Sequence, residues 1–195
     1  FNTVKLINPT IERREINNFY GCNKTEIIDY FVDQQKMDSP EVVKSNLNSE
    51  FNYFLKKEYT ENPNVTLIHP NLPSFFNALR EQDIKITLNT GYNKTIQNLL
   101  LDKFELKDHI DDYISSEEVL RGRPYSFMID KLMERNNVKD PRSVIKIGDT
   151  VADIMEGKNA DCKTVGVLSG SCSKSVLEKY KPDLIIKSIM DLKIN

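Results

Sequence analysis

Two carboxylates four residues apart follow an apolar run at residues 144–147. Gly148 precedes Asp149, and Asp153 comes one helical turn later. Mg²⁺ binds a few carboxylate oxygens together with waters and phosphate oxygens, and a glycine permits a tight turn beneath such a site. We therefore expect Asp149 to be a metal ligand, and Asp153 to hold a metal-bound water or to orient the other ligands. The alternative is that Asp149 caps the next helix and Asp153 lies in its first turn; this pair alone does not decide between the two.

A hydroxyl group and backbone amides follow a second apolar run, at residues 84–88. Thr90 and Gly91 lie between this run and a helix that we expect to begin near Asn93. Since the amino end of a helix attracts anions, Thr90 and Gly91 are candidates to bind phosphate oxygens. By themselves they fit a plain strand-to-helix turn better, with Thr90 or Asn93 serving only as a cap.

Arg123 is a cation at an expected helix entrance. Pro124 follows it as a first-turn proline, and Phe127 is among the apolar residues that this helix would bury. A guanidinium group holds a phosphate or a carboxylate bidentately and keeps its proton. We expect Arg123 to bind an anion. The alternative is a solvated side chain paired with Glu117 or Glu118, which would contribute little to stability.

Lys24 lies in a break between two predicted helices. One helix ends near Gly21, and the next begins near Thr25. A lysine at this point is either an exposed residue at a helix start or a cation directed at a site, and the local pattern leaves both open.

The first third of the chain is predicted to be a helical domain, residues 1–66. Ser39 and Pro40 supply the N-cap and the first-turn proline of one of its helices. Apolar residues recur in that helix at spacings of three and four, so they share one face: Val43, Leu47, Phe51, Phe54 and Leu55.

Residues 67–195 are predicted to form an α/β domain. Short apolar runs alternate with helical segments there, which is typical of a parallel sheet with helices on both faces. The expected strands are 84–88, 144–147, 164–168 and 184–186. Ligands bind beyond the carboxyl ends of such strands, where Thr90 and Asp149 stand.

These motifs resemble those of haloacid dehalogenase superfamily hydrolases. Residues 146–167 resemble the fourth motif, and Thr90 stands where the second motif has its Ser or Thr. The run 122–124, Gly-Arg-Pro, resembles the phosphonatase-like branch, in which this Arg replaces the usual Lys of the third motif. Residues 21–24 resemble the Gly-x-x-Lys loop of that branch's cap. The resemblance implies an α/β fold with a Rossmann-like parallel core and a helical cap domain.

The resemblance also implies an activity. It is that of a Mg²⁺-dependent hydrolase acting on a small phosphorylated metabolite through an aspartyl-phosphate intermediate. Thr90, Arg123 and Lys24 would be catalytic and would bind substrate, with Gly91 contributing to substrate binding and with Asp149 and Asp153 at the metal. The alternative is a phosphonoacetaldehyde hydrolase, in which Lys24 would form a Schiff base with the substrate.

Catalysis in the superfamily depends on an Asp-x-Asp pair at the end of a first strand, in which the first Asp is the nucleophile and the second is the general acid and base. This sequence has no such pair. The resemblance begins about 20 residues too late to include it. The chain is then truncated relative to the working protein, or complemented by a separate or swapped piece, or a non-catalytic member that binds ligands or partners. We expect truncation, because the motif residues are all retained: Thr90, Arg123, Asp149 and Asp153. We also expect a gap in the sheet, since that strand lies in the middle of it.

Composition excludes several other classes of function. With 27 Lys and Arg against 29 Asp and Glu, the formal charge is −2, which offers no basic surface for a nucleic acid. The three cysteines are scattered without zinc or redox spacing, and no stretch approaches the ~20 apolar residues of a membrane span. We expect a cytoplasmic protein, monomeric or homodimeric, that binds a small phosphorylated or phosphonate substrate.

Overall fold

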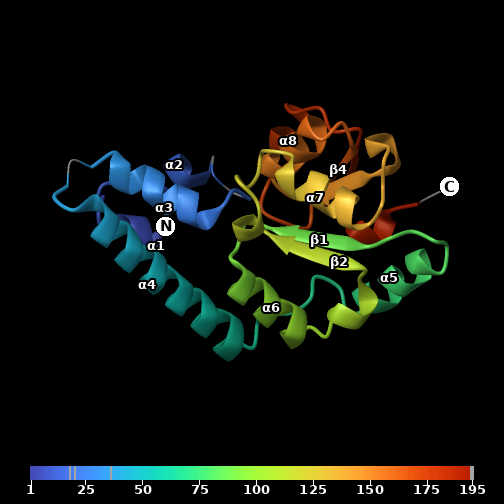
Figure 1. Cartoon of the computed structure of the whole chain (residues 1–195), viewed down its shortest axis with the longest axis horizontal. Coiled ribbons are helices and arrows are strands. Elements are labelled where there is room, and N and C mark those ends of the chain that lie inside the picture. Colours follow the sequence, from blue (N-terminus) through green and yellow to red (C-terminus); the bar gives the residue numbers. More distant parts are fainter. Residues whose placement is uncertain (18, 20, 36, 194–195) are drawn as a thin grey trace.

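The structure, a computed structural model, describes residues 1–17, 19, 21–35 and 37–193. The chain forms a helical region and an α/β region that lie side by side (Figure 1). The helical region contains α1 (Asn2–Lys5), α2 (Arg13–Asn17), α3 (Lys24–Asp33) and α4 (Pro40–Glu61).

Two apolar clusters hold the helical region together. Ile27 and Phe31 of α3 belong to one cluster, which includes Val4. Ile28 of α3 and Leu47 of α4 belong to the other. Because both clusters draw only on residues before position 52, the helical region has a core of its own.

The predicted starts of α3, α4 and α6 are confirmed, but the capping of α4 differs from the prediction. Asn23 caps α3, since its side-chain oxygen accepts from the backbone N–H groups of Thr25 and Glu26. Ser39 stands at the N-cap of α4, as predicted, but its side chain makes no capping hydrogen bond. Its backbone is left-handed, with φ 59°, so the hydroxyl group does not reach the helix amide groups.

The α/β region alternates helices with strands. Its helices are α5 (Leu72–Arg80), α6 (Lys94–Lys103), α7 (Phe127–Arg135), α8 (Val151–Asn159) and α9 (Lys174–Glu178). Its strands are β1 (Thr87–Thr90), β2 (Asp112–Ser115), β3 (Ile145–Gly148), β4 (Lys163–Val167) and β5 (Leu184–Ile186). Four 3₁₀ turns complete it: η1 (Lys107–His109), η2 (Ser116–Glu118), η3 (Pro141–Ser143) and η4 (Ile189–Asp191).

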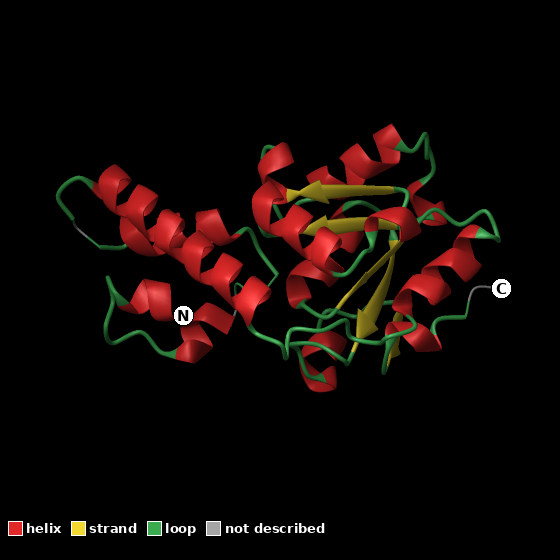
Figure 2. Ribbon diagram, turned by 90° about the horizontal axis from the view of Figure 1, so that it is seen from below, coloured by secondary structure: helices red, strands yellow, loops and turns green. Residues whose placement is uncertain are grey.

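All the described strand pairs are parallel, as predicted, but the strands form two sheets. β1 pairs with β2, and β3, β4 and β5 form the second sheet in that order. Figure 2 shows the strands in these two groups. The expected gap therefore lies between β1 and β3, which are not paired with each other.

Two strand predictions need correction. β1 begins at Thr87 rather than at residue 84, because the N–H of Ile86 donates to the Asp111 carboxylate and not to a neighbouring strand. β2 was not predicted at all. Its four residues include Asp112 and Ser115, so it lacks the apolar run that marks a buried strand.

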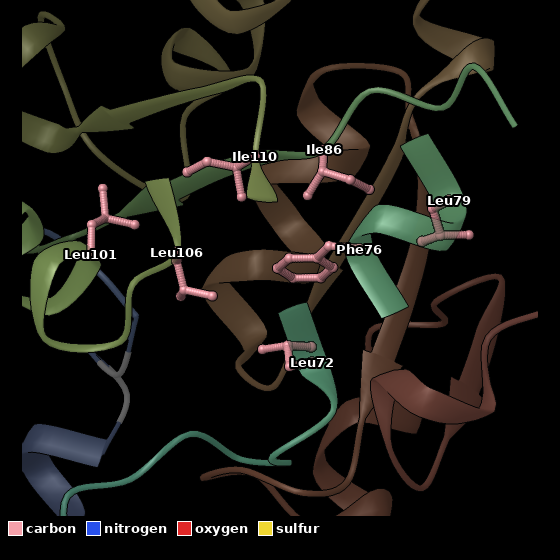
Figure 3. Close-up of a cluster of buried hydrophobic side chains, with 7 residues drawn as sticks. All are labelled: Leu72, Phe76, Leu79, Ile86, Leu101, Leu106 and Ile110. Carbon is pink, nitrogen blue, oxygen red and sulfur yellow. The ribbon is translucent and has the colours of Figure 1, made fainter. Parts of the chain in front are cut away.

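A cluster of seven buried apolar residues supports β1 from one side. Phe76 of α5 lies at its centre, with Ile86 and Ile110 nearby (Figure 3). Phe76 is 4% exposed. This cluster shares no residue with the clusters of the helical region. Among the helices that the structure describes, none combines the length and the apolar composition that a membrane span requires.

A cavity of about 890 Å³ is lined by residues of both β1 and β3 and is called here the inter-sheet cavity. Its walls include Leu88 of β1, Phe76 of α5 and Ile129 of α7. A hydrogen bond between described residues crosses from one sheet to the other, from Lys146 Nζ to Asn89 Oδ1 at 2.6 Å.

Candidate active site

A second cavity, of about 430 Å³, lies where the helical region meets the ends of β1 and β3 and is called here the site cavity. It collects residues from α3, from the turn after β1, from the turn before α7 and from the turn after β3. The site residues predicted from the sequence all line it: Lys24, Thr90, Gly91, Arg123, Asp149 and Asp153.

The loop before α3 is pressed against the α/β region. Gly21 has φ 85°, and a Cβ atom there would lie 2.3 Å from Thr150 Oγ1. A Cβ atom at Gly91 would lie 2.5 Å from the carbonyl oxygen of Cys22. The backbone N–H of Lys24 also donates to the Gly91 carbonyl at 3.2 Å. Only glycine fits these two positions without a shift of the loop, so they fix where Lys24 enters the cavity.

Lys24 is not an exposed residue at a helix start, because its amine is largely buried. Burial, together with the nearby positive charge of Arg123, lowers the pKa of Lys24 to about 8. Its Nζ atom lies 5.8 Å from the centre of the Tyr92 ring. A depressed pKa leaves part of the amine neutral near physiological pH, which is the form that attacks a carbonyl group.

Thr90 ends β1 and faces the site cavity. Its Oγ1 atom accepts a hydrogen bond from the backbone N–H of Tyr92 at 3.2 Å. The cap of α6 is Asn93, whose Oδ1 accepts from the N–H of Ile96 at 2.9 Å. Because Asn93 serves as the cap, the Thr90 hydroxyl is not needed for that purpose.

Arg123 is buried and makes an ion pair with Asp153, 30 residues further along the chain. It is therefore not the solvated side chain paired with Glu117 or Glu118 that we weighed as the alternative. Glu118 pairs instead with Lys94 and Arg135. The Nε atom of Arg123 is buried and has no hydrogen-bond partner among the described residues.

The helix that we expected Pro124 to open begins later. α7 starts at Phe127, with Ser126 at its N-cap. Phe127 is 36% exposed and stacks on the Tyr125 ring, so it is not buried as predicted. The residues 122–126 form a turn instead, and Arg123 points from this turn to the site.

Asp153 is held by several donors. Arg123 and Lys146 reach its Oδ1 atom, the latter at 3.1 Å. The backbone N–H and the hydroxyl group of Thr150 donate to Oδ2, at 3.2 and 2.5 Å. Burial alone would raise the pKa of Asp153, but the charges of Arg123 and Lys146 outweigh it and hold that pKa well below its usual range. Asp153 therefore stays ionised and has little capacity left for a further ligand.

Thr150, not Asp149, is the N-cap of α8, so the capping role that was the alternative for Asp149 is wrong, whereas Asp153 does lie in the first turn of α8. The Asp149 carboxylate lies under the next loop, where the N–H of Ser171 donates to Oδ2 at 2.6 Å. A Cβ atom at Gly170 would lie 2.2 Å from the same oxygen, so this close approach requires a glycine. Asp149 faces the site cavity, with an Oδ1 atom for which no hydrogen bond is found within the described chain.

The described residues supply only part of the oxygen ligands that Mg²⁺ needs. One carboxylate of Asp149 is suitable, because Mg²⁺ is usually held by one or two carboxylates together with waters and phosphate oxygens. Within the described residues, no group of three or more His, Cys, Asp and Glu side chains is placed to hold a metal ion. Further oxygens would have to come from water, from the substrate or from another carboxylate.

A buried network that the sequence did not reveal lies beneath these residues. Lys146 Nζ is 2.7 Å from Glu156 Oε2, and both residues are buried. Asn89 donates to Glu156 Oε1 at 2.9 Å, which ties β1 to α8. The available signal was a lysine within the apolar run 144–147, since a buried lysine needs partners.

Known proteins match much of this chain in sequence. A family model described as haloacid dehalogenase-like hydrolase matches residues 2–167. A phosphonoacetaldehyde hydrolase from Latilactobacillus sakei is 35% identical over 122 residues, which are 62% of this chain and 46% of that protein. One from Bacteroides fragilis is 32% identical over 158 residues, covering 79% of this chain and 58% of that protein. The chain thus spans about half the length of the curated relatives it matches.

Solved structures show the same fold. A phosphonoacetaldehyde hydrolase-like protein from Oleispira antarctica superposes with a TM-score of 0.76 at 20% identity, covering 98% of this chain and 81% of that one. A predicted phosphoglycolate phosphatase from Haemophilus somnus superposes with a TM-score of 0.73 at 18% identity, covering 97% and 85%. At these identities the likeness concerns the fold.

Proposed function

Because the chain belongs to the haloacid dehalogenase-like hydrolase family, we propose that it supplies the phosphate-binding part of a Mg²⁺-dependent hydrolase. The proposed substrate is a small phosphorylated or phosphonate compound. One observation carries the proposal: a hydroxyl group, two cations and two carboxylates from four separate segments all face one cavity. The near balance of acidic and basic residues disfavours a nucleic-acid partner. An anionic ligand would therefore bind at a local cluster of cations such as the one in this cavity.

The proposed roles follow the chemistry of each group. Thr90 and the amide of Gly91 would donate hydrogen bonds to phosphoryl oxygens, and Lys24 would offset their negative charge. Arg123 would contribute its charge and its free Nε donor while Asp153 holds the guanidinium in place. Asp149 would be a ligand of Mg²⁺, which when bound neutralises charge on the phosphoryl oxygens.

We propose that residues 1–66 act as a cap over residues 67–195. Two observations support this division: the helical region has its own apolar clusters, and the loop 21–24 reaches the site from it. A cap that covers the site excludes water from the reacting group.

The nucleophile of this family is an aspartate on a strand, and we propose that such a strand occupies the inter-sheet cavity. β1 and β3 present their unpaired edges there, and every described pair of strands is parallel. Arg123, Asp149 and Asp153 line both the inter-sheet cavity and the site cavity. A parallel strand in that space would therefore bring its carboxyl end to these three residues.

The test is Mg²⁺-dependent hydrolysis of 4-nitrophenyl phosphate. The chain itself is compared with a version carrying an added strand that ends in Asp-x-Asp, each with and without Mg²⁺. We expect turnover only with the strand and the metal together, and we expect Asp149→Ala to abolish it. The matched control is Asp140→Ala, which removes an exposed carboxylate in a solvated pair with Arg142. Inactivity of the strand-bearing protein in all conditions would favour a non-catalytic, ligand-binding function.

A second candidate is cleavage of a carbon–phosphorus bond next to a carbonyl group, with Lys24 forming a Schiff base. It is favoured by the lowered pKa of Lys24 and by its place in the same cavity as Thr90. The neutral amine would attack an aldehyde carbon and release water, leaving an imine on Nζ. Borohydride reduces such an imine to a stable secondary amine.

This candidate is tested by mass spectrometry after adding phosphonoacetaldehyde and borohydride. A stable adduct on the peptide that contains Lys24, absent from Lys24→Arg, would support it. Hydrolysis of aryl phosphates without any adduct at Lys24 would leave the phosphatase as the function.

A further inference from the structure

The site cavity is lined by two chemically different sets of residues, and each set is called here one end of the cavity. Thr90, Arg123, Asp149 and Asp153 form the end contributed by the α/β region, whereas Lys24 comes from α3 of the helical region. The other end is formed by apolar side chains of the helical region: Val4, Ile16, Phe19, Ile27, Phe51 and Leu55. Among the described residues of the helical region that line the cavity, only Thr3 and Lys24 carry polar side chains.

The site cavity as a whole is large compared with a phosphoryl group. Cavities of about 300–1,000 Å³ hold ligands of drug size, and this one has a volume of about 430 Å³. A phosphoryl group placed at Thr90 and Arg123 would leave most of that volume empty. A site for a substrate with only two carbon atoms would not need this space.

The exposure of the residues that α4 contributes to the apolar end also indicates space for an apolar group. Phe51 and Leu55 lie one helical turn apart on α4 and are only half-buried, although both are apolar. Phe54, between them in sequence, is 53% exposed and does not line the cavity. Since residues four apart share one helix face, Phe51 and Leu55 present a continuous apolar surface to the cavity.

We propose that this cavity binds an organophosphorus compound whose organic part carries an apolar chain of several carbon atoms. The inference rests on the proposed function, because it places the phosphorus group at the polar end. The apolar chain of the ligand lies against Phe51 and Leu55 of α4 and against Phe19. A sugar phosphate fits poorly, since its hydroxyl groups would lose their water without gaining partners there.

The test is calorimetric titration of this chain with inorganic phosphate and with methyl-, propyl- and hexylphosphonate. None of these ligands requires turnover. Burying one methylene group contributes about 0.8 kcal/mol, so affinity is expected to rise about fourfold for each added methylene. The binding heat capacity should also become more negative along the series, as apolar surface is buried.

Two variants locate the effect. Leu55→Asn is expected to lower the affinity for hexylphosphonate about tenfold while leaving that for inorganic phosphate unchanged. Leu55→Trp, which fills the apolar end, should do the same without adding a polar group. Phe54→Asn is the matched control on the same helix and should change neither affinity. Circular dichroism checks that each variant is folded.

The outcomes separate the inference from the proposed function. If phosphate and methylphosphonate bind but affinity does not grow with chain length, the inference is wrong and the anion site stands. The inference would also be wrong if affinity rose with chain length equally in Leu55→Asn and Leu55→Trp, since the alkyl chain would then bind elsewhere. If neither phosphate nor any phosphonate binds, with or without Mg²⁺, the proposed function fails as well.

Discussion

Gly91 lies so close to the backbone of Cys22 that a Cβ atom on residue 91 would stand 2.5 Å from the Cys22 carbonyl oxygen. Residue 91 follows the strand that carries Thr90, and residue 22 belongs to the loop that carries Lys24. The two backbones can touch because residue 91 is a glycine, which has no side chain to hold them apart. The place of Lys24 in the site therefore depends on a contact between two regions with separate cores.

Replacing Gly91 with alanine should weaken this contact. The new methyl group must displace a backbone segment rather than a flexible side chain, and overpacking of this kind costs about 1–3 kcal/mol. Urea unfolding of Gly91→Ala should show that loss. The matched control is Gly166→Ala, where the nearest atom to the new Cβ is a terminal methyl group of Leu177, at 3.1 Å. A loss at Gly91 no larger than at Gly166 would contradict the prediction.

Removing the amine of Lys24 should stabilise the protein at neutral pH. The folded state lowers the pKa of Lys24 from 10.5 to about 8, so it disfavours the protonated form. This cost, on the order of 3 kcal/mol, is fully present below pH 8 and disappears as pH rises towards 10.5.

Lys24→Met is therefore expected to unfold at higher urea concentration than the unmodified chain at pH 7. The difference should shrink between pH 8 and 10. Lys94→Met, at a side chain that is 57% exposed, is the control and should show no comparable dependence on pH. A constant advantage of Lys24→Met across this range would show that burial does not perturb the amine.

The ion pair of Arg123 with Asp153 should make the fold sensitive to acid. The folded state lowers the pKa of Asp153 below its unfolded value of about 3.9. Its contribution to stability is therefore present above about pH 4 and is lost as pH falls below that value.

Asp153→Asn should lower stability at pH 7 by about 3–5 kcal/mol, because it leaves Arg123 and Lys146 without their carboxylate. The thermal unfolding temperature of the unmodified chain should fall more steeply between pH 5 and 2 than that of the variant. The control is Asp140→Asn, because the side chain of Asp140 is more exposed than that of Asp153. Parallel pH profiles for Asp153→Asn and the unmodified chain would rule out the predicted coupling.

A pair of tyrosine hydroxyl groups should contribute to the docking of α4. Tyr59 donates to Tyr92 with an oxygen–oxygen distance of 2.7 Å, which joins α4 to the turn after β1. Tyr59→Phe leaves the partly buried Tyr92 hydroxyl without this partner, so we expect a loss of about 1 kcal/mol.

A double-mutant cycle measures this coupling. Tyr59→Phe and Tyr92→Phe should each cost stability, and the double variant should cost less than their sum. Tyr53→Phe, on the outer face of the same helix with 63% exposure, should cost nothing measurable. Additive effects of the two variants would mean that the bond contributes no stability.

The sequence by itself determined what depends on neighbours along the chain. The turn after residues 144–147 and the start of α3 follow from local backbone preferences, which act over a few residues. The resemblance of the motifs to those of the family predicted that Lys24, Arg123 and Asp149 belong to one site, and all three line the site cavity. The parallel arrangement of the strands followed from their alternation with helices.

Only the tertiary structure decided which groups meet across long separations. Nothing local shows that Arg123 finds Asp153, that Lys146 is buried with Glu156, or that β2 forms from a largely polar run. The site's apolar end is likewise built from α3, from α4 and from segments before α3. The helical pattern of each segment does not show that they line one cavity. The physical reason is that burial and ion pairing depend on packing, which joins residues far apart in sequence.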